Sequence, residues 1–277
     1  MSSGPLEDLS RLCLHTITTK PWNIEEAAKH YSASGVKGIT VWRDALAGRK
    51  IRETADMLRD NGLSIVSLCR GGFFPGAEKE KRKAAIDDNR KAIEEAFELG
   101  TDKIVLVCGA DPAQPLKESR KQIFEGISSL LTDAKAAGVK LAIEPLHPMY
   151  ADTRSAINTM AQANDMAESI DSKYVGVAVD VYHLWWDNML ETETKRCGKN
   201  KKLFAFHVCD WNVPTLDFLN DRGLMGDGCI NVPLIRSWVE ETGFTGYHEV
   251  EVFSDKYWAM DQKDYLDKIV NAYLTKT

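Results

Sequence analysis

Three apolar segments in the second half of the chain each end in a side chain that can ionise. The segments KLAIE, VGVAVD and LFAFH end at Glu144, Asp180 and His207. Successive side chains of an extended strand point to opposite faces, so each ionisable residue shares a face with an alanine two residues earlier. The pattern predicts three strands, each with a small residue inside the fold and a polar group just above it.

A fourth segment, HEVEV, contains two acidic residues that could join this group. Glu249 and Glu251 lie two residues apart and therefore share one face of the strand. Glu251 is nearer the C-terminal end of the segment. We therefore expect Glu251 to be the fourth member, with Glu249 as the alternative.

The four side chains together indicate a metal site. Three neighbouring carboxylates repel one another strongly unless a cation compensates their charge. Three carboxylates and one imidazole form an oxygen-rich donor set that favours one divalent ion, with Mn2+ as the first expectation and Mg2+, Co2+ or Zn2+ as alternatives. Each residue alone could form an ordinary salt bridge, but four at consecutive strand ends favour a functional site.

The whole chain alternates short β-rich runs with longer segments of helical periodicity, which indicates parallel strands covered by helices. Several helical segments end at a glycine, as helices that precede a strand often do. We predict that residues 1–277 form a single α/β domain, a (β/α)8 TIM barrel, with a doubly wound open sheet as the alternative. The predicted strands are Arg11–His15, Lys37–Trp42, Ser64–Cys69, Lys103–Cys108, Lys140–Glu144, Val175–Asp180, Leu203–Val208 and Tyr247–Phe253.

In a barrel of this kind the active site lies at the C-terminal ends of the strands, where the four ionisable residues would meet. The segment after the first strand, LCLHTITTKPW, contains no glycine-rich phosphate-binding motif, which argues against a nucleotide cofactor. The long irregular segment Asp210–Asn231 is typical of a binding loop.

The motifs IEPLH, DVYH, HVCD, GDG and GYHEVEVF in this half of the chain resemble those of the xylose isomerase-like TIM-barrel superfamily. That group includes sugar phosphate isomerases and epimerases, inosose dehydratase and metal-dependent AP endonucleases. The resemblance implies that Glu144, Asp180, His207 and Glu251 bind the metal and that the two glutamates are also the acid/base groups. It further implies that His183 contacts substrate oxygens.

Further polar and aromatic residues are expected at the same mouth as substrate-binding groups. Arginines there could bind a carboxylate, a phosphate or hydroxyls through paired hydrogen bonds, and tryptophans could pack against a sugar ring. The alternative for the arginines is a salt bridge at the rim. These candidates are His147, Asp210, Arg222, Trp42, Arg70 and His15.

The composition argues against nucleic acid and membrane as partners. The net charge of -6 lacks the basic footprint of a nucleic-acid-binding protein, and the remaining histidines do not reproduce the spacing of the family's nucleases. No run approaches the roughly 20 apolar residues of a membrane span. The first residues lack the basic and apolar regions of a signal peptide, and six cysteines without a close pair are typical of reduced thiols, so we expect a cytoplasmic protein. The oligomeric state stays open, a homo-oligomer included.

The chemistry expected of this site is isomerisation or epimerisation of a ketose or related sugar or polyol. A metal-stabilised enediolate would form when one glutamate removes the proton next to a carbonyl, and the other glutamate would return a proton. The alternative is a lyase, a dehydratase or β-eliminase acting on a keto-sugar or keto-glycoside. A third hypothesis is a sugar-binding barrel without turnover.

Overall fold

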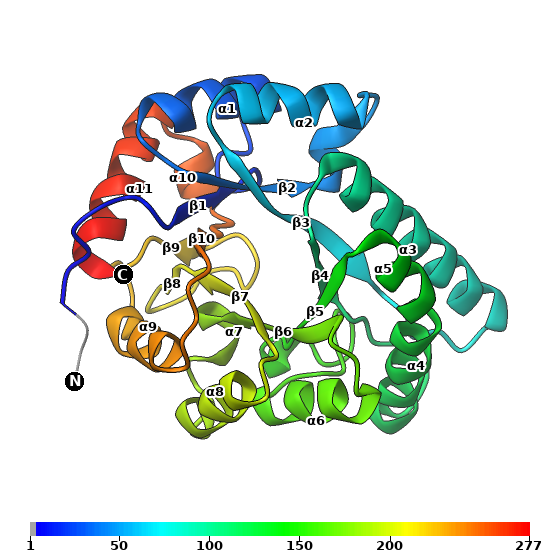
Figure 1. Ribbon diagram of the computed structural model, residues 1–277. Coiled ribbons are helices and arrows are strands. Elements are labelled where there is room, and N and C mark those ends of the chain that lie inside the picture. The colour runs from blue at the N-terminus through cyan, green and yellow to red at the C-terminus, as the bar shows by residue number, and fades with distance from the viewer. Residues whose placement is uncertain (1–3) are drawn as a thin grey trace.

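The computed structural model describes residues 4–277, in which eight parallel strands close into a barrel surrounded by helices (Figure 1). Around the ring the strands run in the order β1-β10-β7-β6-β5-β4-β3-β2. The closing pair joins β1 to β10, with Leu12 beside His248. The predicted (β/α)8 barrel is thereby confirmed, and the open sheet is wrong. The strands are β1 (Leu12–His15), β2 (Gly38–Trp42), β3 (Ser64–Gly72), β4 (Lys103–Val107), β5 (Lys140–Glu144), β6 (Val175–Asp180), β7 (Leu203–Val208) and β10 (His248–Val250).

Helices follow the strands and cover the outside of the ring. Two of them end at a glycine in the left-handed conformation, Gly100 (φ +77°) and Gly138 (φ +70°), which a residue without a Cβ adopts at no steric cost. The longer helices are α1 (Ile24–Ala33), α2 (Ile51–Asp60), α3 (Lys79–Leu99), α4 (Leu116–Ser129), α5 (Leu131–Ala137), α6 (Met160–Ile170), α8 (Leu190–Lys199), α9 (Val232–Glu241) and α11 (Gln262–Lys276). The short ones are η1 (Arg43–Leu46), η2 (Pro148–Tyr150), α7 (Val181–Leu184) and α10 (Asp255–Trp258).

The strand β3 runs three residues further than the sequence pattern predicts. Its end lies against the side chain of Asn89 in α3, which accepts a hydrogen bond from the backbone of Gly72 (2.7 Å) and donates one to its carbonyl (2.8 Å). Gly72 has φ +110°, and a Cβ there would lie 1.9 Å from the carbonyl oxygen of Val107. The glycines after Cys69 thus let β3 approach β4 closely at the mouth.

The interior of the barrel is filled by small side chains directly below the mouth. Alanines from three neighbouring strands pack there with Cys69 of β3 and Val105 of β4. The larger apolar side chains lie in a second core between the strands and the helices. Small residues inside leave room for polar groups above them, as the alternation in β5, β6 and β7 predicts. The three alanines are Ala142, Ala178 and Ala205.

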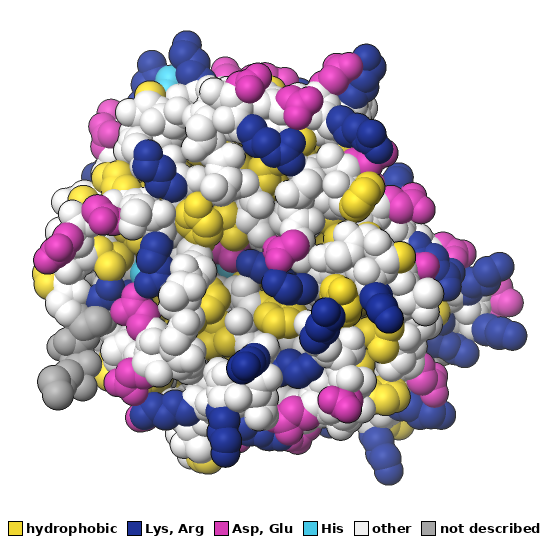
Figure 2. Space-filling view, viewed as in Figure 1, with side chains coloured by type: hydrophobic (Ala, Val, Ile, Leu, Met, Phe, Trp, Pro, Cys, Tyr) yellow, Lys and Arg dark blue, Asp and Glu magenta, His cyan; other side chains and the backbone are white. Residues whose placement is uncertain are grey.

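The surface is of mixed charge. Basic and acidic side chains are interspersed over the face shown in Figure 2, and hydrophobic side chains there form only small separate groups. Among residues 4–277, no helix is both long enough and apolar enough to cross a membrane.

The interior layer should tolerate little added volume. We expect Ala178→Leu to lower the free energy of unfolding by about 1–3 kcal/mol because its side chain must displace close-packed neighbours. Ala136 of α5 is exposed, so Ala136→Leu is the matched control and should change stability by less than about 0.5 kcal/mol. Chemical denaturation of both variants measures the difference. Equal stability of the two would contradict a packed interior.

Candidate metal centre

Four buried side chains converge at the mouth of the barrel. Glu144 and Asp180 end β5 and β6, His207 lies one residue before the end of β7, and Glu251 follows β10. Each is at most 4% exposed. One potential ligand atom from each lies within 4.8 Å of those from the other three. These are the four residues that the sequence pattern selects, and Glu249 is not one of this group.

The donor atoms of this group fit a divalent cation. Glu144 Oε1, Asp180 Oδ2 and His207 Nδ1 are buried and have no hydrogen-bond partner. Glu144 Oε1 lies 2.8 Å from His207 Nδ1, yet the two are not aligned as donor and acceptor. The second oxygen of Asp180 accepts a hydrogen bond from the backbone of Tyr182 (2.7 Å), which fixes the carboxylate. Unpaired buried atoms that face one point are expected where an ion completes the site.

The electrostatics of the four residues also call for a cation. Burial raises the pKa of Asp180 to about 7, and the Glu251 and Glu144 carboxylates add to this rise against the opposing effect of Arg222. For His207 burial acts in the other direction, but the carboxylates of Glu144, Glu249 and Glu251 outweigh it and raise the pKa to about 10. Without an ion, the site therefore retains protons that a metal would displace.

Arg222 reaches the same site from the long loop. It lies in β9 (Arg222–Gly223), which pairs with β8 (Asp210–Trp211). Its Nη1 donates to Glu251 Oε2 (2.8 Å) and lies 3.5 Å from Asp180 Oδ2. The guanidinium is 4.3 Å from the ring centre of Tyr182 and 4.9 Å from that of Phe253. Arg222 therefore lies beside the four residues, and its contact with a substrate stays a prediction.

The imidazole of His183 lies at the edge of the site. Its Nδ1 lies 3.3 Å from the backbone nitrogen of His147 and its Nε2 lies 3.4 Å from Nη2 of Arg222, so a donor group faces each ring nitrogen. Burial and the charge of Arg222 hold the pKa of His183 well below its usual range, so the ring is neutral. Nε2 lies 3.7 Å from Asp180 Oδ2, at the edge of the metal site.

The side chain of His147 lies among aromatic rings beside the mouth. Its ring centre is 5.1 Å from that of Trp211 and 5.7 Å from that of Trp186. Tyr182 stacks on Trp211, with the two ring centres 4.8 Å apart. This cluster gives the rim an apolar wall next to His183.

Asp210 has a different task from the one predicted. Both of its carboxylate oxygens are occupied by backbone N–H groups of its own loop: those of Gly226 and Gly228 bind Oδ2 and that of Ile230 binds Oδ1, each at 2.9 Å. Trp211 donates a further bond to Oδ1 (2.8 Å). The expected substrate contact of Asp210 is therefore replaced by a structural role, which shapes the loop that carries Arg222.

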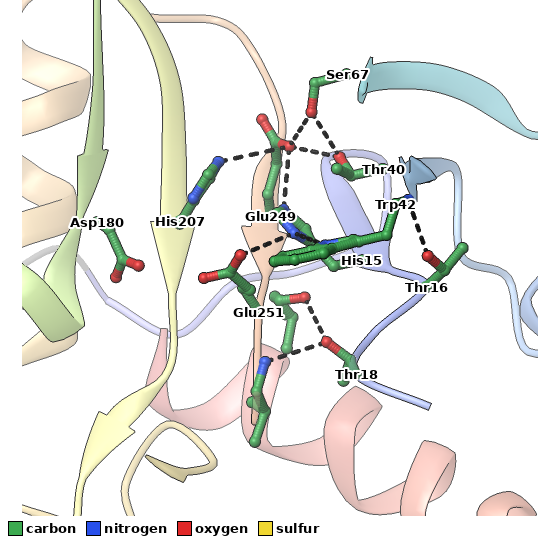
Figure 3. Close-up of polar contacts among 12 residues, drawn as sticks. His15, Thr16, Thr18, Thr40, Trp42, Ser67, Asp180, His207, Glu249 and Glu251 are labelled. Carbon is green, nitrogen blue, oxygen red and sulfur yellow. Dashed lines mark hydrogen bonds and ion pairs between the residues drawn. The ribbon is translucent and has the colours of Figure 1, made fainter. Parts of the chain in front are cut away.

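Glu249 lies in a second polar layer beneath the metal site (Figure 3). Its Oε2 accepts hydrogen bonds from Thr40 (2.5 Å) and Ser67 (3.0 Å). The same oxygen is 3.4 Å from His15 Nε2 and 3.8 Å from His207 Nε2. The carboxylate thus faces the far nitrogen of His207 and leaves Nδ1 toward Glu144. Thr40 and Ser67 were missed from sequence, where the only signal is a hydroxyl at an inward position of β2 and β3.

His15, Trp42 and Arg70 line the other side of the mouth. Trp42 Nε1 donates to His15 Nδ1 (3.2 Å), and this nitrogen lies 3.2 Å from Glu251 Oε1. His15, His207 and Glu251 form a second group whose potential ligand atoms lie within 4.8 Å of one another. The guanidinium of Arg70 lies 5.9 Å from the ring centre of Trp42.

Comparison with known proteins agrees with this fold. The sequence pattern of the family described as xylose isomerase-like TIM barrel matches residues 26–271. The inosose isomerase of Bacillus velezensis is 23% identical, with 96% of this chain and 99% of that protein covered. The 3-dehydro-D-guloside 4-epimerase of Escherichia coli is 23% identical, with 82% of this chain and 86% of that protein covered.

Two solved structures share the barrel. The protein SMc04130 from Sinorhizobium meliloti is 43% identical and covers 98% of this chain and 100% of its own, with a TM-score of 0.93. The IOLI protein, whose structure contains a zinc atom, is 21% identical with a TM-score of 0.83 and covers 95% of this chain and 96% of its own.

Metal binding should release protons from Asp180 and His207. Because the pKa of Asp180 is raised to about 7 and that of His207 to about 10, protons compete with the ion below these values, and affinity must rise with pH. We expect the affinity for Mn2+ to increase at least about tenfold from pH 6 to pH 8, since each displaced proton contributes about tenfold per pH unit. Calorimetry in two buffers of different ionisation enthalpy measures the protons released.

The control for this measurement is an exposed acidic residue of the rim. Asp180→Asn should weaken Mn2+ binding strongly, whereas Asp152→Asn, at an exposed position, should not. A pH-independent affinity, or equal effects of the two substitutions, would count against the site.

The second layer should tune the metal site without contacting the ion. Glu249→Gln removes the charge that faces His207 Nε2, and we expect the affinity for Mn2+ to fall about 10–100-fold, the usual effect of such outer groups. Glu241, an exposed residue of α9, provides the control Glu241→Gln. Unchanged affinity in a folded Glu249→Gln protein would refute the assigned role.

Proposed function

We propose that this chain, which belongs to the xylose isomerase-like TIM barrel family, is a divalent-metal-dependent isomerase or epimerase of a ketose or related sugar. The observation that carries the proposal is the buried group of three carboxylates and one imidazole at the barrel mouth, with unpaired donor atoms. The catalytic names of its relatives, an inosose isomerase and a sugar epimerase, support an enzyme over a barrel that only binds sugars.

Glu144, Asp180, His207 and Glu251 would hold the ion. The oxygen-rich donor set favours Mn2+, and the zinc atom of the IOLI protein supports a divalent metal in general. A bound ion would supply a Lewis acid for a substrate carbonyl oxygen.

Glu144 and Glu251 are the two acid/base groups that we propose. Glu144 and Glu251 approach from β5 and β10, which are separated in the ring by β6 and β7. Although burial opposes it, the adjacent Arg222 guanidinium holds the pKa of Glu251 well below its usual range and keeps it as a carboxylate, the form that accepts a proton. One glutamate would remove the proton from the carbon next to the carbonyl, and the other would return it at the adjacent carbon or the opposite face.

The remaining groups would bind and orient the substrate. The imidazole of His183 and the guanidinium of Arg222 lie next to Asp180 and can form hydrogen bonds with substrate hydroxyls. The aromatic rings around His147 and Trp211 would exclude water on one side. Arg222 is held between two carboxylates, so its position is fixed before substrate arrives, which lowers the cost of ordering it.

Solvent exchange tests the proton transfer directly. A ketose incubated with the Mn2+-loaded protein in D2O should gain deuterium at the carbon next to the carbonyl, observed by NMR. We expect Glu144→Gln and Glu251→Gln to lower the exchange rate at saturating metal by at least about a hundredfold, the usual contribution of an acid/base group.

Glu241→Gln, on the exposed face of α9, should exchange at the normal rate. Exchange accompanied by loss of water or an aglycone in the product mass would assign a lyase. Binding of ketoses without exchange in any of them would refute proton-transfer catalysis.

A further inference from the structure

Two arginines at the barrel mouth have no polar partner. Among residues 4–277, every other arginine side chain makes a hydrogen bond or an ion pair. The guanidinium groups of Arg70 and Arg154 make neither and contact only aromatic rings. Both residues are half-buried. Unpaired, partly desolvated guanidinium groups are costly, so their occurrence together indicates a ligand.

The backbone brings these two arginines to the same part of the mouth. Arg70 lies near the end of β3 and contacts Phe73 at 4.4 Å, and Phe73 donates a backbone hydrogen bond to Val107 of β4 (2.8 Å). Gly109, just beyond β4, donates to the carbonyl of Arg154 (2.8 Å). A Cβ on Gly109 would lie 2.7 Å from the Cα of Phe73, so the three segments are in direct contact.

Each arginine is connected to the metal site by one aromatic ring. Arg154 lies 5.5 Å from the ring centre of Tyr150, which is itself 5.8 Å from that of His183. Arg70 lies over Trp42, whose indole donates to His15 beside Glu251. An aromatic residue and a histidine thus separate each arginine from the proposed metal ligands.

Charge and space both suit an anionic group here. Burial and the like charge of Arg154 lower the pKa of Arg70, which shows that the two cations act on one another. A cleft of about 540 Å³ opens beside Arg70, and its lining includes Trp42 and Phe73 together with the acidic Asp44 and Asp88. Lys20 on the cleft wall contacts the ring of Trp258 at 4.6 Å and adds further positive charge.

We propose that Arg70 and Arg154 form a subsite for an oxyanion carried by the sugar, so that the substrate is a sugar acid or a sugar phosphate. This rests on the proposed function and adds a substrate class to it. Guanidinium groups bind carboxylate and phosphate through paired charge-assisted hydrogen bonds, whereas a hydroxyl would leave two positive charges uncompensated. Inosose and 3-dehydro-D-guloside, which the names of the relatives give, are uncharged, so this subsite would distinguish the chain from them.

The test compares three ketoses that differ only at the sixth carbon: D-fructose, D-fructuronate and D-fructose 6-phosphate. Their dissociation constants are measured by calorimetry on the Mn2+-loaded protein. We expect at least one anionic ketose to bind at least tenfold more tightly than fructose, and the tighter one identifies carboxylate or phosphate. Raising the salt concentration should reduce this advantage.

Variants connect the preference to the two arginines. Arg70→Gln and Arg154→Gln should each reduce the advantage of the anionic ketose about tenfold and leave the affinity for fructose unchanged, with partial retention in Arg154→Lys. Arg90→Gln changes the net charge equally on the outer face of α3, where Arg90 pairs with Asp133, and should have no effect. Without ligand, Arg70→Gln should be at least as stable as the parent protein, because it removes a half-buried charge that the positive charge of Arg154 opposes.

Three results would overturn the subsite: equal affinity for charged and neutral ketoses, no binding of any of the three, or an equal loss for all three in the arginine variants. The proposed function is tested separately by solvent exchange. Anion preference without exchange would leave the subsite standing and remove the isomerase, and exchange without anion preference would do the reverse.

Discussion

The repulsion among three buried carboxylates at one end of the barrel is the constraint around which the rest of the site is arranged. Glu144, Asp180 and Glu251 cannot all be ionised in a buried space without nearby positive charge. Arg222 supplies part of it, and the raised pKa values of Asp180 and His207 show that more is required. Two features of the fold answer this repulsion. The small side chains below the site leave room for an ion, and the loop that carries Arg222 places a permanent positive charge beside the carboxylates.

The same charge balance governs the polar layer under the site. Glu249 would add a fourth negative charge, but its Oε2 is satisfied by two hydroxyls and faces two imidazoles. Despite burial, the neighbouring His15 and His207 hold its pKa well below the usual range. A carboxylate in that position would orient His207 by its far nitrogen, so that the near nitrogen would be directed at a bound ion. Glu249 and Glu251 share one face of the strand but have different roles, because they lie two residues apart and therefore in different layers.

The sequence predicted the parts of the structure that depend on local alternation. The strand ends at Glu144 and Asp180 follow from the pleat of each strand, and convergence of those ends follows once the barrel is assumed. Closure itself depends on the pairing of β1 with β10, residues more than 200 positions apart, which no local pattern encodes. The same limit explains Asp210, whose motif resembles a binding residue although its partners are backbone groups of a loop that forms only in the fold. Arg154 belongs to no motif, and only the contact of its segment with Gly109 brings it to the mouth.

The mouth therefore carries two sets of charges of opposite sign that do not neutralise each other. The acidic set is buried and compact, and it would select a small divalent cation that can be reached by several oxygens at once. The basic pair is half-buried, with Arg70 beside an open cleft, and in our proposal it would select an anion attached to a larger molecule. Aromatic rings separate the two sets, which prevents Arg70 and Arg154 from collapsing onto the carboxylates as Arg222 does. A ligand that binds the metal at one end and carries an anionic group at the other would match both sets. The net charge of -6 does not reveal the basic pair, because it is a sum over the whole chain.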